Sequence, residues 1–231
     1  TRVRSSAASD VYKRQVTPVG NTPEETWNNL INGKSGAASI TAFNTEKFKT
    51  TFACEVKDLN INEYIDRKEA RKLDRYTQLA IISAMQGVKD AGFDLEKENL
   101  NRIGVVYGVG IGGIKTFEDE VTNYATRREE GPKFNPFFIP KMIADIASGQ
   151  ISMLYGFHGP NYTTTSACAS STNALADAFN LIRLGKADVM VSGGAEAAIC
   201  ECGVGGFNAL HALSTRCLLY TSPSPRDVEE S

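Results

Sequence analysis

A strand, a cysteine and a helix follow one another between residues 161 and 183, and this segment constrains the fold more than any other. The Tyr- and Thr-rich run 162–165 predicts a strand, and the Ala- and Leu-rich residues from Ser170 onward have the spacing of a buried helix. Cys168 lies between them. A thiol at the first turn of a helix meets the positive end of the helix dipole and free N–H groups, which favour the thiolate. The segment therefore predicts a cysteine nucleophile.

The residues alone leave two interpretations of Cys168 open. Small neighbours, such as Ala167 and Ala169, give a substrate carbonyl access to the sulfur, and the Cys168 N–H is placed to help hold an oxyanion. The alternative is a structural cysteine packed under the helix, because free cysteine is among the most buried residue types. Both interpretations stand at this point.

A glycine-rich loop follows the apolar strand expected at 103–107. Gly108, Gly110 and Gly113 have the spacing of a dinucleotide-binding loop. That fingerprint also needs an acidic residue at the end of a second strand, about twenty residues later. Residues 126–131 read TRREEG, which predicts a helix end and a loop instead. A dinucleotide site is therefore disfavoured. A tight turn with a purely structural role is one interpretation of these glycines that stays open.

Strand and helix alternate along the chain, which predicts an α/β class with a largely parallel sheet. The expected elements are helices at 23–32, 76–91, 141–154 and 170–183, and strands at 103–107, 162–165 and 187–192. The mixed-charge run 66–75 is, on its own, typical of a solvated helix face.

Composition excludes several classes of protein. The formal net charge of −2 gives no reason to expect nucleic acid or an anionic membrane as a partner, and no apolar run is long enough to span a bilayer. Five irregularly spaced cysteines do not suggest a disulfide framework, so we expect a reducing cytoplasm. Cys200 and Cys202 lack a second pair or a histidine at zinc-like spacing, and we expect them to be buried. No metal or other cofactor is expected.

Several motifs together resemble the β-ketoacyl-acyl-carrier-protein synthases, the condensing enzymes of fatty-acid synthesis in the thiolase superfamily, and most of all their elongation branch. The motifs are TSACASS at 165–171, YGFHGP at 155–160, DVMVSGGAE at 188–196, GVGGFNAL at 203–210, ALSTR at 212–216, VTPVG at 16–20 and PFFIP at 136–140. The resemblance implies a thiolase-like layered α/β/α/β/α fold, of which this chain covers mainly the first half. We expect the family domain at 16–216, and adapter-like, non-native segments at 1–15 and 217–231.

The resemblance also implies roles for individual residues. Cys168 would take the acyl group from acyl-carrier protein. A substrate pocket is implied at Ile111, Phe137, Phe138 and Phe207, and carrier-protein binding at Lys68, Arg71 and Lys72. Adjacent aromatics such as Phe137 and Phe138 are also common in protein cores. Glu196 is expected to be a structural acid.

In the resembled family the acylated cysteine reacts with malonyl-carrier protein, with loss of CO2, to give a 3-oxoacyl product. Two histidines that assist decarboxylation lie beyond Arg216 in the family pattern, and neither His158 nor His211 matches them. We therefore expect the chain to be inactive alone. The resemblance also implies that the whole protein is a homodimer. We expect neither nucleic-acid nor membrane partners.

Two other functions remain open. One is a non-catalytic, chain-length-factor-like partner subunit, which the presence of Cys168 opposes. The other is a thioester hydrolase with a cysteine nucleophile. The strand-to-helix turn of such hydrolases has glycine two residues before and two residues after the nucleophile, where Ser166 and Ser170 stand in this chain.

Overall fold

A computed structural model describes residues 14–92 and 94–215, which form two compact units. The first unit contains residues 14–16 and Leu59–Ala198, and the second contains Thr17–Asp58 and residues 199–215. Of the segments expected to be non-native, residues 1–13 and all of 217–231 lie outside the described residues.

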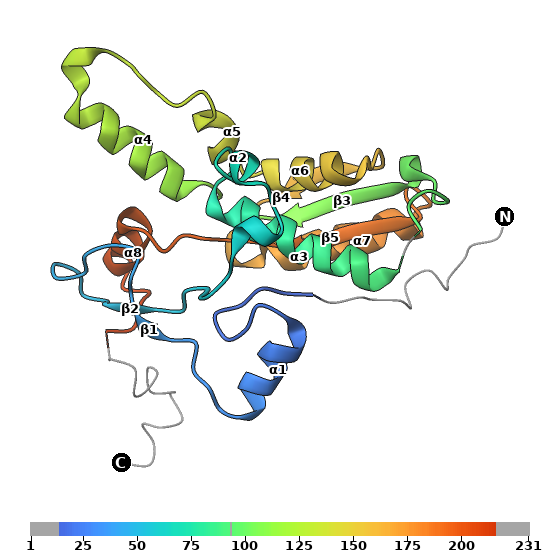
Figure 1. Cartoon of the computed structure of the whole chain (residues 1–231), viewed down its shortest axis with the longest axis horizontal. Helices are drawn as coiled ribbons and strands as arrows, with labels where there is room; N and C mark the ends of the chain where they lie inside the picture. The colour runs from blue at the N-terminus through green and yellow to red at the C-terminus, as the bar shows by residue number, and fades with distance from the viewer. Residues whose placement is uncertain (1–13, 93, 216–231) are drawn as a thin grey trace. The chain divides into compact units, whose positions relative to one another are not determined.

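A three-stranded parallel sheet forms the centre of the first unit (Figure 1). Its strands are β3 (Ile103–Gly108), β4 (Asn161–Thr164) and β5 (Val189–Gly194), in the order β4-β3-β5. Every residue of β3 is buried, as expected for a central strand covered on both faces. The predicted parallel α/β sheet is confirmed.

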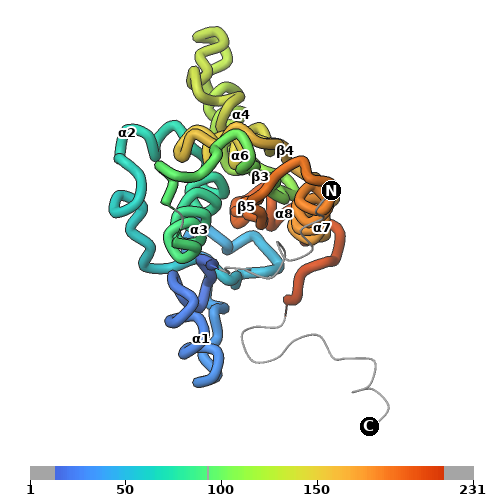
Figure 2. The backbone as a smooth tube through the Cα atoms, turned by 90° about the vertical axis from the view of Figure 1, so that its right-hand side faces the viewer, coloured from blue at the N-terminus to red at the C-terminus, as the bar shows by residue number. Residues whose placement is uncertain are grey.

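Helices cover both faces of this sheet. α3 (Arg75–Ala91) and α6 (Ile146–Tyr155) pack together on one face, and α7 (Ser170–Arg183) covers the other (Figure 2). α3 ends at Gly92, whose φ of +65° is the left-handed conformation that glycine adopts without strain. The core between the layers contains large, fully buried side chains, among them Tyr76, Ile82, Val105, Val106 and Ile151.

The remaining helices of the first unit are α2 (Arg67–Ala70), α4 (Ile114–Thr126) and α5 (Phe138–Met142). α4 and α5 pack on each other and extend away from the sheet (Figure 1). Short 3₁₀ turns occupy Ile61–Glu63, Leu100–Arg102, Arg128–Glu130 and Ala167–Ala169.

The helix expected at 141–154 is confirmed over Ile146–Tyr155, where it ends at Gly156, but its first residues are wrong. Ile143 is extended, with φ −65° and ψ 131°, and separates α5 from α6. Main-chain carbonyls at the break have partners from elsewhere in the chain: the Met142 carbonyl accepts the Gly113 N–H, and the Ile143 carbonyl accepts the Tyr76 hydroxyl. Tertiary hydrogen bonds thus replace the helical ones that the periodicity predicted.

The second unit contains α1 (Pro23–Ile31), a two-stranded antiparallel sheet of β1 (Ala38–Ser39) and β2 (Phe52–Ala53), and α8 (Glu201–Ala209). Thr22 caps α1 by accepting the Glu25 N–H, and Pro23 stands at the first helical position, as the sequence predicts. The Thr50 hydroxyl lies 2.8 Å from the Asn208 side-chain oxygen and 2.9 Å from the Ser214 carbonyl, which links the two chain segments of this unit.

Among the residues described, no helix has the length and apolar character needed to cross a membrane.

Candidate active site

The carboxyl ends of the three parallel strands meet at one edge of the sheet. Gly108, the last residue of β3, is in register with Thr164 of β4 and with Gly194 of β5. Cys168 follows β4 by four residues, and Glu196 follows β5 by two. Open α/β sheets bind ligands outside the carboxyl ends of their strands. This edge is therefore the candidate active site.

Cys168 lies in a strained turn between β4 and α7, here called the cysteine elbow (residues 165–170). Ala167, directly before the cysteine, has a φ of +51°, which is uncommon for a residue with a side chain. Such strain persists only where neighbouring structure enforces it, and it clusters at functional sites. Cys168 is exposed, whereas Cys200 is buried. This exposure does not fit the alternative of a cysteine packed under a helix.

Ser170 holds the cysteine elbow in place. Its hydroxyl donates to the Ala167 carbonyl at 2.7 Å and accepts the Ser166 N–H at 2.9 Å, and the residue is only 4% exposed. Asn173, one turn along α7, donates to the Ser166 hydroxyl at 2.6 Å. Sequence patterns gave neither side chain a role in holding the turn, because their partners lie in its non-repetitive part, where no periodic pattern applies.

Glycines bring α7 directly onto the strand ends. A Cβ atom on Gly108 would lie 2.3 Å from the Ser170 carbonyl carbon, and one on Gly194 would lie 2.5 Å from the Ser171 Cβ. Real Cβ atoms do not approach other atoms this closely, so the first turn of α7 needs glycine at both positions. Gly108 therefore allows the first turn of α7 to pack closely on β3, a steric role that does not depend on a bound dinucleotide.

Glu196 connects the end of β5 to the same glycine-rich loop. Its carboxylate accepts the Ile111 N–H at 2.7 Å. Ile111 itself is exposed at 46%, so its side chain is accessible at the surface of this unit. The interpretation of Glu196 as a structural acid agrees with this bond.

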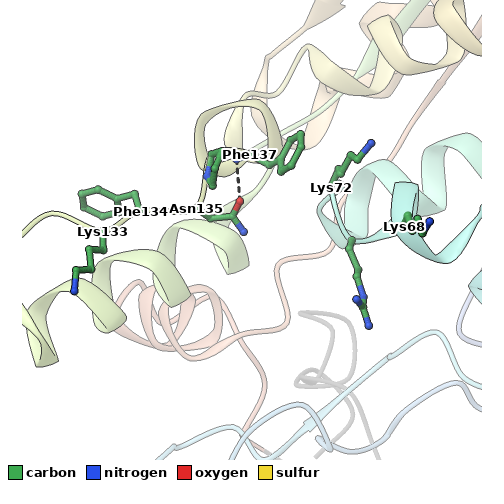
Figure 3. A pocket seen from close by; sticks show the side chains of 8 residues that line it. Lys68, Lys72, Lys133, Phe134, Asn135 and Phe137 are labelled. Carbon is green, nitrogen blue, oxygen red and sulfur yellow. Dashed lines mark hydrogen bonds between the residues drawn. The ribbon is translucent and has the colours of Figure 1, made fainter.

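The three cations expected to bind a carrier protein line one hollow of about 600 Å³ (Figure 3). This basic groove is lined by Lys68, Arg71, Lys72, Lys133, Phe134, Asn135, Pro136 and Phe137. The Lys72 ammonium lies 5.7 Å from the centre of the Phe137 ring and also pairs with Glu69 at 2.6 Å. Lys133 joins the groove from a loop some sixty residues later, and the sequence did not single it out because linear spacing carries no signal for it.

The expected pocket aromatics are placed in three different surroundings. Phe137 lines the basic groove beside Lys72. Phe138 stacks on Phe134, with ring centres 5.4 Å apart, and lies near Phe117 at 6.4 Å. Phe207 lies on α8 in the second unit and is 37% exposed. Their roles toward a substrate stay predictions.

A smaller hollow of about 360 Å³ adjoins the cysteine elbow. It is lined by Thr164, Thr165, Ser166, Asn173, Ala176 and Asp177, from the end of β4 and from α7. Most of these side chains are hydroxyls, an amide or a carboxylate, so the hollow suits polar contents better than an acyl chain.

Within residues 14–92 and 94–215, no group of three or more His, Cys, Asp or Glu side chains is arranged to hold a metal ion. Cys202 is exposed, so the expectation that both members of the Cys200/Cys202 pair are buried is wrong for Cys202. It lies in the first turn of α8, a helix that buries Gly203 and Val204 instead.

The chain matches the family model for the N-terminal domain of β-ketoacyl synthases over residues 14–223. It is 42% identical over 211 residues to 3-oxoacyl-[acyl-carrier-protein] synthase 2 of Staphylococcus aureus, covering 91% of this chain and 52% of that protein. The enzyme of the same name from Synechocystis is 41% identical over 202 residues, covering 87% of this chain and 48% of that protein. The chain thus spans about half the length of these curated relatives.

Solved structures agree with this assignment. The ishigamide ketosynthase/chain length factor aligns with a TM-score of 0.79 and 26% identity, over 88% of this chain and 51% of that one. A β-ketoacyl synthase from Burkholderia phymatum aligns with a TM-score of 0.75 and 25% identity, over 88% of this chain and 52% of that one. The expected thiolase-like α/β fold, covered over about half its length, is confirmed. The chain belongs to the β-ketoacyl synthase family and carries its N-terminal domain.

Proposed function

We propose that this chain is the cysteine-bearing part of a β-ketoacyl-acyl-carrier-protein synthase that elongates fatty acyl chains. The observation that carries the proposal is the cysteine elbow. An exposed thiol follows a residue at φ +51° and precedes α7, and a buried serine holds the turn. Exposure and a place at a helix N-terminus favour a reactive thiolate, and backbone strain clusters at functional sites.

The first half of the reaction is acyl transfer to Cys168. The thiolate attacks the carbonyl carbon of an acyl thioester, a new C–S bond forms, and the bond to the carrier's thiol breaks. The carrier leaves as a thiolate and takes up a proton. In the second half, malonyl-carrier protein loses CO2, and its carbanion attacks the acyl-cysteine to give 3-oxoacyl-carrier protein and free Cys168. Donors on the developing enolate oxygen lower the barrier to decarboxylation.

Neither His158 nor His211 is assigned to that second half. The main-chain N–H of His158, in the turn before β4, donates to the Leu100 carbonyl at 2.9 Å. His211 lies just after α8 at a φ of +54°. We expect the chain alone to carry out acyl transfer to Cys168 at most, and not condensation.

The basic groove is the proposed docking site for the carrier protein. In this family the carrier is acidic, and Lys68, Arg71 and Lys72 present three cations on one side of the groove. Lys133 adds a fourth from the other side, as Figure 3 shows. Complementary charge of this kind increases the association rate and orients the partner. Homodimer formation and a cytoplasmic location stay predictions.

A chain-length-factor-like partner subunit is the second candidate, because one structural relative, the ishigamide ketosynthase/chain length factor, pairs a ketosynthase with such a factor. Cys168 opposes that role, since a non-catalytic subunit has no use for an exposed nucleophile on a strained turn. A thioester hydrolase is disfavoured because Ser170, and not glycine, bridges the elbow.

Acyl transfer from a long-chain acyl-carrier protein to the chain tests the proposal, with the modified peptide identified by mass spectrometry. We expect the acyl group on Cys168, and none on the exposed Cys54 or Cys202. Cys168→Ala is the matched control and should take up no acyl group. Modification of Cys54 and Cys202 with Cys168 unmodified would overturn the proposal.

A further inference from the structure

Glu196 lies where the glycine-rich loop approaches the cysteine elbow. A Cβ atom on Gly110 would lie 2.8 Å from Glu196 Oε2 and 3.6 Å from the Ala167 carbonyl oxygen. The Glu196 carboxylate and the carbonyl of the residue that precedes Cys168 thus both lie near the same side of the loop backbone at Gly110. The next N–H along the loop, that of Ile111, donates to the same Oε2 atom at 2.7 Å.

The loop is attached separately at its two ends. At the start, Gly108 packs on Ser170 and its carbonyl accepts the Ala195 N–H at 3.1 Å. At the end, the Gly113 N–H donates to the Met142 carbonyl at 3.1 Å. Between these points, Glu196 binds the Gly110–Ile111 segment. Removing the carboxylate therefore leaves the loop attached but frees the segment that carries Ile111.

We propose that Glu196 is a positioning residue that fixes Ile111 beside the cysteine elbow and so determines which acyl chains react at Cys168. This inference rests on the proposed function. Glu196 acts through Ile111: its carboxylate accepts a main-chain N–H and leaves the exposed isoleucine side chain available to an apolar ligand. An anchored apolar side chain favours a long alkyl chain over a short one, because it offers contact area that a short chain does not bury.

The chain itself permits a test that needs no condensation. Iodoacetamide and N-octyl iodoacetamide both alkylate a thiolate, forming an S–C bond with loss of iodide. The rate of each reagent at Cys168 is measured by peptide mass spectrometry, with Cys54 in the same sample as the internal reference. At each cysteine, the rate with N-octyl iodoacetamide is divided by the rate with iodoacetamide. The readout is this ratio at Cys168 divided by the same ratio at Cys54.

We expect the unaltered chain to favour the octyl reagent at Cys168, and Glu196→Ala to lower the normalised ratio roughly tenfold, as loss of one charge-assisted hydrogen bond would. Glu196→Gln, whose amide oxygen still accepts the Ile111 N–H, should keep the ratio. Glu196→Asp, which is one methylene shorter, should behave like Glu196→Ala. Ile111→Ala should lower the ratio by itself and have no further effect in the Glu196→Ala background.

Failure of the inference and failure of the proposed function give different results in this experiment. An unchanged ratio in both Glu196→Ala and Glu196→Asp would overturn the inference and leave the proposed function intact. Absence of any octyl preference at Cys168 in the unaltered chain would overturn the substrate assignment on which the inference rests. Thermal unfolding of each variant, with Glu98→Ala as an exposed acidic control, separates these results from loss of the fold.

Discussion

The carboxylate of Asp74 accepts hydrogen bonds from both the main-chain N–H and the hydroxyl of Thr116, forty-two residues later in the chain. The same carboxylate caps α3 by accepting the Tyr76 N–H at 3.2 Å. Asp74 is 4% exposed and Thr116 is 6% exposed. One buried side chain therefore joins the start of α3 to the first turn of α4, directly after the glycine-rich loop.

Asp74→Ala should lower the free energy of unfolding by about 3 kcal/mol, because three donors lose an anionic partner in a buried site. Thr116→Val, which removes the hydroxyl alone, should cost about 1 kcal/mol. Urea unfolding followed by circular dichroism measures both changes. Glu98→Ala, at an exposed acid, is the control and should shift stability by under about 0.5 kcal/mol. Equal effects of Asp74→Ala and Glu98→Ala would contradict this account.

Replacing glycine by alanine should change the stability of the chain in opposite directions at positions 108 and 87. Gly108→Ala places a Cβ 2.3 Å from the Ser170 carbonyl carbon, so it should destabilise the chain by about 1–3 kcal/mol through forced backbone shifts. Gly87→Ala, inside α3 with no atom within 4 Å of the new Cβ, should stabilise it by about 0.5–1 kcal/mol. Thermal melts of both variants provide the comparison. A neutral Gly108→Ala would show that α7 does not depend on this close approach.

Stability should fall in alkaline solution because of two buried tyrosines. Burial raises the pKa of Tyr107, whose hydroxyl lies 3.0 Å from that of Ser83, and burial likewise raises the pKa of Tyr76. In the unfolded chain a tyrosine ionises near pH 10. The contribution of the neutral phenols is therefore fully present below about pH 10 and is lost as the pH rises toward the folded-state pKa values.

Urea unfolding between pH 8 and pH 11 measures this loss. Tyr107→Phe should cost about 1 kcal/mol at pH 8, for the hydrogen bond to Ser83, and should make the alkaline decline shallower. Tyr64→Phe, at a partly exposed tyrosine of the same unit, provides the reference variant. A decline of the same steepness in both variants would count against Tyr107 as its source.

Charge reversal in the basic groove should weaken carrier-protein binding. Lys68→Glu or Arg71→Glu replaces attraction by repulsion toward an acidic partner, and we expect affinity to fall roughly tenfold or more at low salt. The difference should shrink as salt is added, because screening weakens exposed charge pairs. Lys97→Glu changes the net charge equally at a side chain that is 83% exposed and outside the groove. Titration calorimetry at two salt concentrations compares the three. Equal losses in all of them would show an effect of net charge alone.

Local sequence signals predicted the elements of this fold where the local pattern and the tertiary environment agree. Helix α3 matches its expected range to within one residue, because Asp74 caps its start and Gly92 ends it. The β3 strand was found from its apolar run. The helix expected at 141–154 is interrupted near its start because Tyr76 and Gly113, both distant in sequence, bind carbonyls at the break. Single-sequence periodicity contains no information about such partners.

At the candidate site, too, local sequence signals were informative, whereas contacts between distant segments were not visible in the sequence. Cys168 was singled out from its own neighbourhood, since strand, small residues and helix all surround it in sequence. Lys133 joins the basic groove, and Glu196 binds Ile111, only because the fold brings distant segments together. The glycine pattern at 108–113 matched a dinucleotide loop by spacing. Its steric reasons are the approach of Ser170 to Gly108, of Glu196 to Gly110 and of the 141–142 backbone to Gly113.

The hydroxyl of Ser170 should be necessary for the reactivity of Cys168. It donates to the Ala167 carbonyl and accepts the Ser166 N–H, so it closes the turn in which Ala167 is strained. Alanine at position 170 makes neither bond, and the elbow then relaxes toward an ordinary φ at Ala167, which moves the sulfur away from the N-terminus of α7. We expect Ser170→Ala to lower acyl transfer to Cys168 roughly tenfold.

Ser171→Ala is the matched control, because it removes the adjacent hydroxyl but keeps the Cβ that faces Gly194. It should leave the rate of acyl transfer unchanged. Iodoacetamide alkylation of Cys168, measured against Cys54 in the same sample, separates a change in the thiol from a change in substrate binding. If Ser170→Ala and Ser171→Ala reacted alike with both reagents, the geometry of the turn would not be what activates the cysteine, and the N-terminus of α7 alone would have to account for its reactivity.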